Sequence, residues 1–80
     1  MNTSKSVLSI KNYGKIHVHL KEKMAERNLT RNYLAKIVNT RFEVIDKWYR
    51  DDVEKLDLDI LARICYVLDC SPAELITYEN

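Results

Sequence analysis

The chain reads LTRNYLAKIVNTRFEVIDKWYR from residue 29 to residue 50, a stretch with two runs of helical character. Thr30 can cap the N-terminus of a helix over residues 31–38. Four apolar residues of that run are expected to face the core: Leu34, Ala35, Ile37 and Val38. Asn39 tolerates the left-handed backbone in which a helix can end. The stretch therefore predicts two helices joined by a turn of about three or four residues.

The second of these helices is expected over residues 42–50. Ile45 and Trp48, together with Tyr49, follow the i, i+3, i+4 spacing of an inward-facing stripe. Thr40 could cap this helix one residue early, or Arg41 could project outward from its start. On the outer face, the charged side chains could form two i,i+4 ion pairs, Glu43–Lys47 and Asp46–Arg50. Each such pair stabilises a helix by about 0.2–0.5 kcal/mol.

Three further helices are predicted outside this stretch. The first covers residues 20–27 and ends at Asn28. The next begins at Asp57 or Asp59, and its apolar residues follow the i, i+3, i+4, i+7 pattern: Leu61, Ile64, Cys65 and Leu68. The tetrapeptide at residues 71–74, Ser-Pro-Ala-Glu, combines an N-cap, a proline at the first helical position and a capping-box glutamate. It predicts a short last helix that runs through Ile76.

The two ends of the chain carry weaker signals. Residues 1–14 show no sustained periodicity, so we interpret them as a flexible N-terminal arm and place the folded domain at residues 15–80. Residues 15–19 alternate, with Ile16 and Val18 on one side and two histidines on the other. Residues 76–78 form the other β-like run. These two short runs could pair within one chain or between two subunits.

Composition supports a single helical domain. Eighty residues leave room for one core. With 46% hydrophobic residues, the chain is too apolar for a disordered protein. One glycine and one proline are too few for the many turns of a β-sandwich or barrel. We therefore predict an all-α, five-helix fold, with a short β-pairing of the terminal segments as an option.

The net charge of +1 conceals a strong asymmetry. Residues 1–50 hold eleven Lys and Arg against four Asp and Glu, whereas residues 51–80 hold two against eight. A basic surface, if the fold creates one, belongs to the first two thirds of the chain. Within residues 29–50 alone, five basic residues face two acidic ones.

Several classes of function find no support in the sequence. No apolar run approaches the 18 residues of a membrane span, and no signal-peptide core is present, so we expect a cytoplasmic protein without membrane contact. Cys65 and Cys70 are then expected as free thiols. His17 and His19 could join them at a metal, but the spacing typical of zinc ligands is missing. No nucleophile elbow or phosphate-binding glycine loop appears, so we expect neither an enzyme nor a cofactor.

Two short helices separated by a tight turn form the helix-turn-helix layout, in which the second helix lies in the major groove of DNA. The chain resembles the Cro/repressor-type, or XRE, family of helix-turn-helix domains, especially its short bacterial and phage members. The resemblance rests on residues 29–40, Ile45, residues 61–65 and residues 68–72, and it covers roughly residues 16–78. It implies a lambda-repressor-like fold and double-stranded DNA as the partner. Asn39 replaces the usual glycine of the turn, and Asp51-Asp52 follow the second helix, where glycine is frequent.

The resemblance also implies which residues contact DNA. The candidates for base or groove contact are Arg41, Phe42, Glu43 and Lys47. Arginine and lysine pair with guanine, glutamate accepts from cytosine, and Phe42 could touch a thymine methyl. The candidates for phosphate contact are Arg31, Lys36 and Arg50, followed by Arg27 and Lys55 as weaker ones. For each charged candidate the alternative is an ordinary solvated surface charge.

Two functions follow as hypotheses. The first is a sequence-specific transcriptional regulator, a repressor acting as a homodimer on an inverted-repeat operator, with no small-molecule ligand. The second is a protein–protein interaction module, such as an adaptor, antirepressor or antitoxin-like partner, built on the same scaffold. The near-neutral net charge and the mixed signs on the helix at residues 42–50 motivate the second hypothesis, because most DNA-binding proteins gain affinity from excess positive charge.

Overall fold

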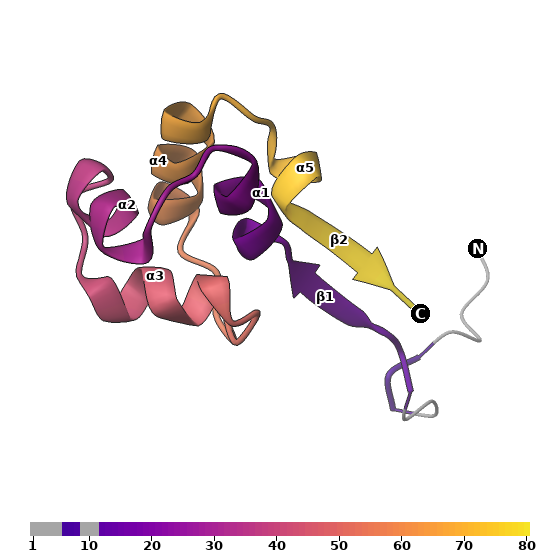
Figure 1. Cartoon of the computed structure of the whole chain (residues 1–80). Coiled ribbons are helices and arrows are strands. Elements are labelled where there is room, and N and C mark those ends of the chain that lie inside the picture. Colours follow the sequence, from indigo (N-terminus) through magenta and orange to yellow (C-terminus); the bar gives the residue numbers. More distant parts are fainter. Residues whose placement is uncertain (1–5, 9–11) are drawn as a thin grey trace.

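The structure is a computed structural model that describes residues 6–8 and 12–80. In these residues, five short helices surround one apolar core, and a two-stranded antiparallel sheet extends from one side of the helical body (Figure 1). The elements are β1 (Lys15–Val18), α1 (Leu20–Glu26), α2 (Arg31–Ile37), α3 (Phe42–Tyr49), α4 (Leu58–Leu68), α5 (Pro72–Leu75) and β2 (Ile76–Glu79). The five-helix prediction is confirmed, and the first three helices each end one residue earlier than expected.

Three of the helices begin at the N-caps predicted from the sequence. The Thr30 hydroxyl accepts a hydrogen bond from the Tyr33 N–H at 3.1 Å. Asp57, one of the two expected caps of α4, accepts from the second and third N–H groups of that helix. Glu74 Oε2 accepts from the Ser71 N–H at 2.8 Å, as the capping box predicts. Each contact satisfies a backbone donor that the helix itself leaves unpaired.

Asparagine or aspartate follows each of α1 to α4 in a left-handed conformation. These residues are Asn28, Asn39, Asp51 and Asp69, with φ between 52° and 57°. Asn and Asp tolerate this region because their short polar side chains can hydrogen-bond locally. The predictions for Asn28 and Asn39 are confirmed. A chain with one glycine can therefore still make four abrupt helix ends.

The core forms where the inner faces of the helices meet. Ile45 is fully buried and Trp48 is 3% exposed, which confirms that the tryptophan packs inward. The core residues are Val18, Leu20, Met24, Leu34, Ala35, Val38, Ile45, Trp48, Ile60, Leu61, Ile64, Leu68 and Leu75. One prediction was wrong: Ile37 is 38% exposed, because it lines an open pocket beside Ala62 and Arg63 of α4 and is not covered by that helix.

The two strands pair within one chain. The register aligns Lys15 with Glu79 and Val18 with Ile76. The expectation that the last helix includes Ile76 was wrong, because α5 ends at Leu75 and Ile76 begins β2. The His19 N–H donates to the Leu75 carbonyl at 2.7 Å and continues the pairing into the helical body.

The expected arm at residues 1–14 includes residues 1–5 and 9–11, which lie outside the described residues. Across residues 6–8 and 12–80, no helix is both long enough and apolar enough to cross a membrane.

Candidate functional site

The turn between α2 and α3 is held by backbone and side-chain hydrogen bonds. The Asn39 N–H donates to the Lys36 carbonyl at 3.2 Å, and the Thr40 N–H donates to the Ala35 carbonyl at 3.0 Å. From α4, the Arg63 guanidinium donates to the carbonyls of Val38 and Asn39 at 3.1 and 2.9 Å. These bonds satisfy carbonyls that the end of a helix leaves free. They fix the direction in which α3 leaves the turn.

Helix α3 is strongly amphipathic, with a buried inner face and a charged outer face. Ile45 and Trp48 anchor it in the core. The residues that remain exposed are Arg41, Glu43, Lys47 and Arg50. Figure 1 shows α3 along the lower edge of the helical body, opposite α4 and α5. The side chains that were predicted to read bases therefore lie on a free helix face, apart from Phe42.

The four base-contact candidates differ in their surroundings. Arg41 is the N-cap residue of α3, but its side chain makes no capping bond, so it is free to project outward. Phe42 is half-buried, and the Arg31 guanidinium lies over its ring at 5.6 Å. Glu43 and Lys47 are exposed, and within the described residues neither takes part in an ion pair. The expected Glu43–Lys47 pair is therefore absent from the part of the chain that is described.

The phosphate-contact candidates differ in the ion pairs that they form with other residues of the chain. Asp46 Oδ1 lies 2.6 Å from Arg31 Nη1, and Asp46 Oδ2 lies 3.1 Å from Arg50 Nε. The expected Asp46–Arg50 pair is confirmed, and the contact with Arg31 adds a link between α2 and α3 that was not predicted from the sequence. Lys36 is exposed and forms no ion pair within the described residues.

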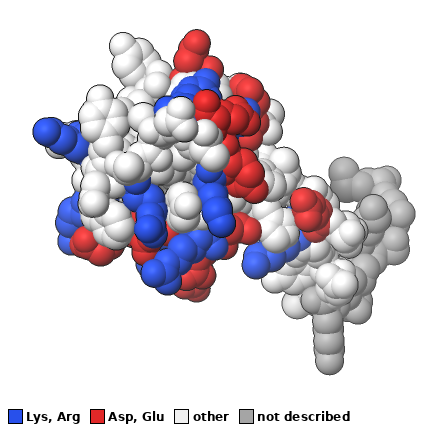
Figure 2. All heavy atoms as spheres, viewed as in Figure 1, with Lys and Arg blue, Asp and Glu red and all other residues white. Residues whose placement is uncertain are grey.

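The charge asymmetry of the sequence appears on the surface. In Figure 2, most of the visible Lys and Arg atoms lie over the lower and left parts of the helical body, where Figure 1 draws α2 and α3. The Asp and Glu atoms gather toward α5 and the strands, although some also lie among the basic ones. The α3 face is thus basic but carries both signs.

A groove runs beside α3 on the side of the loop that leads to α4. Its volume is about 570 Å³, and its lining includes Lys47, Trp48, Val53 and Lys55. The lining also includes Glu54 and Asp57, so the groove carries charges of both signs next to the outer face of α3. Lys55, a weaker phosphate candidate, therefore lies on the same side of the molecule as Lys47.

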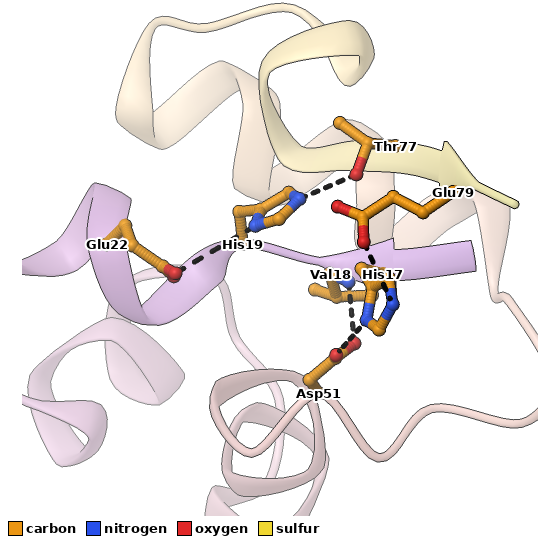
Figure 3. A network of polar contacts seen from close by, with 7 residues as sticks. All are labelled: His17, Val18, His19, Glu22, Asp51, Thr77 and Glu79. Carbon is orange, nitrogen blue, oxygen red and sulfur yellow. Dashed lines mark hydrogen bonds and ion pairs between the residues drawn. The ribbon is translucent and has the colours of Figure 1, made fainter. Parts of the chain in front are cut away.

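Asp51, the second residue after the end of α3, joins that helix to the strands (Figure 3). Asp51 Oδ1 accepts a hydrogen bond from the Val18 N–H at 2.6 Å, and Asp51 Oδ2 lies 2.7 Å from His17 Nδ1. On the other side of the imidazole, Glu79 Oε1 lies 3.5 Å from His17 Nε2. The hydrogen bond with His17 lowers the pKa of Asp51, and the Val18 N–H acts in the same direction, against the opposing effect of burial.

The second histidine makes a separate set of contacts. His19 Nε2 lies 2.7 Å from the Thr77 hydroxyl, and His19 Nδ1 lies 3.9 Å from Glu22 Oε2 (Figure 3). Both histidines thus connect β1 to its neighbours. Among the described residues, no group of three or more His, Cys, Asp or Glu side chains could hold a metal ion. Local sequence patterns do not predict this network, although the alternation of two histidines in a short predicted strand indicates where it lies.

The two cysteines are free thiols that are half-buried and packed against the core. Burial raises the pKa of the Cys70 thiol, and the neighbouring Cys65 and Glu74 act in the same direction. A raised pKa keeps the thiol protonated and therefore poorly nucleophilic.

Comparisons with known proteins agree with this geometry. A family model described as the Cro/C1-type HTH DNA-binding domain matches residues 19–80. Among solved structures, the chain is similar to a crystal structure described as that of "a putative DNA-binding protein from Bacteroides fragilis". The two chains share 24% sequence identity with a TM-score of 0.69, and the match covers 79% of this chain and all of the other. That likeness establishes the fold. No curated protein matches the chain.

Proposed function

The chain belongs to the Cro/C1-type helix-turn-helix DNA-binding domain family, and from this premise we propose that it is a sequence-specific transcriptional regulator. One observation carries the proposal: α3 is anchored through Ile45 and Trp48 while Arg41, Glu43 and Lys47 on its outer face stay exposed. A rigid helix with a free polar face can enter a major groove, which is wide enough for one helix. We place the DNA-binding domain at residues 15–80 and the protein in the cytoplasm.

In the proposed complex, α3 reads bases. Arg41 and Lys47 donate to guanine O6 and N7, and Glu43 accepts from cytosine N4. Phe42 is half-buried at the start of the helix, where its ring edge can meet a thymine methyl. These residues occupy the first and second turns of α3, the part of a recognition helix that approaches base edges in helix-turn-helix complexes.

Phosphate contacts position the helix. Lys36 is the least encumbered of the proposed contacts, because it is exposed and unpaired within the described residues. Arg31 and Arg50 are both bound to Asp46, yet a guanidinium carries five N–H donors and can serve a carboxylate and a phosphate together. Phosphate contacts of this kind set register and orientation without reading sequence.

The protein acts as a homodimer on an inverted repeat and represses by occupying its operator. Two symmetry-related α3 helices about 34 Å apart would meet successive major grooves on one face of the duplex. The acidic residues 51–80 would then lie away from the phosphates or between the subunits.

Selection of bound fragments from genomic DNA tests this proposal. We expect one enriched palindromic sequence, with two half-sites separated by about one helical turn. Affinity for that duplex should fall with salt at a log–log slope of about −0.9 for each phosphate neutralised. Random recovery of fragments, together with no affinity for any duplex at low salt, would contradict the proposal.

A protein–protein interaction module remains the second candidate function. The Asp46 contacts favour it, because they neutralise part of the positive charge of Arg31 and Arg50 on the α3 face. A module of this kind would bind a protein through α3 and would not bind DNA at low salt. The same salt series therefore separates the two functions.

A further inference from the structure

Among the charged residues of α3, Asp46 has the least exposed side chain. Its side chain is 18% exposed, whereas the side chains of Arg31 and Arg50 are 40% and 68% exposed. Each carboxylate oxygen contacts a different arginine: Oδ1 contacts Arg31 of α2, and Oδ2 contacts Arg50, the C-cap residue of α3. One carboxylate therefore holds two of the three proposed phosphate-contact residues.

Aromatic rings hold one of these arginines from a second direction. The Arg31 guanidinium carbon lies 4.6 Å from the centre of the Tyr49 ring and 5.6 Å from the centre of the Phe42 ring. Cation–π contact adds to the ion pair with Asp46, and both rings belong to α3. Arg31 is therefore fixed with respect to α3, although its own backbone belongs to α2.

We propose that Asp46 is a positioning residue that determines DNA specificity by holding Arg31 and Arg50 in fixed orientations beside α3. This inference rests on the proposed function. Long side chains that are free to move can follow phosphates of any duplex, whatever its register. Side chains held in place contact phosphates only where the phosphates lie at matching positions along the DNA backbone. They therefore favour the one register on the DNA in which α3 also contacts the bases that it reads.

The proposal makes Asp46 a source of discrimination even though its charge opposes DNA binding. The carboxylate places a negative charge among the phosphate contacts, and removing it would increase attraction to any duplex. Removing it would also release the two arginines. The affinity for unrelated DNA should therefore rise, while the affinity for the operator rises less or falls.

The test compares Asp46→Asn with Asp52→Asn on two DNA duplexes. The first duplex is the sequence enriched by genomic selection, and the second is a shuffled sequence of the same composition. Asp52 follows α3 closely, is exposed and forms no ion pair among the described residues, so its variant removes one negative charge without releasing an arginine. Affinities are measured by fluorescence anisotropy at a single salt concentration.

We expect Asp46→Asn to lower the ratio of operator affinity to shuffled-DNA affinity by about fivefold or more. Asp52→Asn should strengthen binding to both duplexes by the same factor and leave the ratio unchanged. Equal effects of both variants on the ratio would overturn the inference while leaving the proposed function intact. A wild-type protein that binds neither duplex at low salt would contradict the proposed function itself, and the inference would fall with it.

A measurement on the wild-type protein keeps the proposal testable if Asp46→Asn does not fold. NMR relaxation of the arginine Nε–H groups reports how tightly each guanidinium is held. Arg31 and Arg50 should be clearly more ordered than Arg41, which has no ion pair within the described residues. Equal mobility of the three side chains in the free protein would overturn the proposal.

Discussion

The carboxylate of Asp51 accepts a hydrogen bond from the backbone N–H of Val18 at 2.6 Å, which ties the end of α3 to the last residue of β1. Asp51 lies in a left-handed conformation with φ of 57°, where glycine is the usual residue. Aspartate satisfies the backbone requirement at some cost, and it supplies an acceptor that glycine lacks. The orientation of α3 is therefore coupled to the strand pair as well as to the core.

Replacing Asp51 should destabilise the domain through this contact. Asp51→Gly keeps the left-handed conformation but leaves the Val18 N–H and His17 without their partner, so we expect a loss of about 1–3 kcal/mol in the free energy of unfolding. Asp51→Asn keeps one neutral acceptor and should cost less. Chemical denaturation measures both values. Asp52→Asn is the control, and a loss as large as that of Asp51→Gly would contradict the role of the contact.

The Asp51 contact should also depend on pH in the acid range. The pKa of Asp51 is lowered from its ordinary value of 3.8 in the folded protein, chiefly by the hydrogen bond with His17. A carboxyl with a lowered pKa stabilises the fold above its ordinary pKa and loses that effect as the pH falls through the lowered value. The stability difference between wild type and Asp51→Asn should therefore shrink as the pH falls from about 5 to below 3.8. A stability difference that grows over this range would be inconsistent with a lowered pKa of Asp51 in the folded protein.

Base reading should depend on the exposed side chains of α3. Arg41→Ala and Lys47→Ala should each reduce discrimination against single base changes in the operator by about 1–3 kcal/mol, because each would remove a contact to a base edge. Competition binding with operator variants measures the effect. A uniform weakening on all sequences would instead assign that residue to phosphate.

Phosphate contact, which does not depend on base sequence, can be tested at Lys36. Lys36→Ala should weaken binding to every sequence alike and reduce the magnitude of the log–log salt slope by about 0.9, the value for one phosphate. Affinities over a salt series, on operator and shuffled duplexes, give both quantities. Lys15→Ala, a change at an exposed residue of β1 outside the helix-turn-helix, serves as the charge-matched control and should leave the slope unaltered.

The anchoring of α3 can be tested at its buried face. Ile45 is fully buried, so Ile45→Ala should cost about 2–5 kcal/mol of unfolding free energy through lost apolar burial and the cavity that remains. Thermal melting checks this value. A loss below about 1 kcal/mol would mean that α3 is not held by the core in solution.

Much of this fold could be predicted from local sequence. Thr30, Asp57 and the Ser71–Glu74 capping box mark helix starts because each cap acts within a few residues of itself. The two helices of the helix-turn-helix and their exposed charges could also be predicted, because the spacing of apolar residues along a helix is a local property of the sequence. The exposure of Ile37 could not be predicted, because periodicity gives a face but not the neighbour that would cover it.

The contacts of the candidate site were harder to foresee. Asp46–Arg50 is an i,i+4 pair and was expected, but Arg31 reaches Asp46 from another helix, and no local rule gives that distance. The contact of Asp51 with His17 joins residues 34 positions apart. The sequence showed Asp51 only as a departure from the glycine that is frequent after the second helix, because its partners depend on where the strand pair lies.

An NMR titration tests most directly whether α3 is the surface that binds DNA. The ¹H–¹⁵N spectrum of the 9.5 kDa protein is recorded as the duplex enriched by genomic selection is added. We expect the largest shift changes at the amides of residues 41–47, with smaller changes at residues 31 and 36. Changes confined to α4, α5 and the strands, or no changes at all, would contradict the assignment of α3 as the DNA-reading helix.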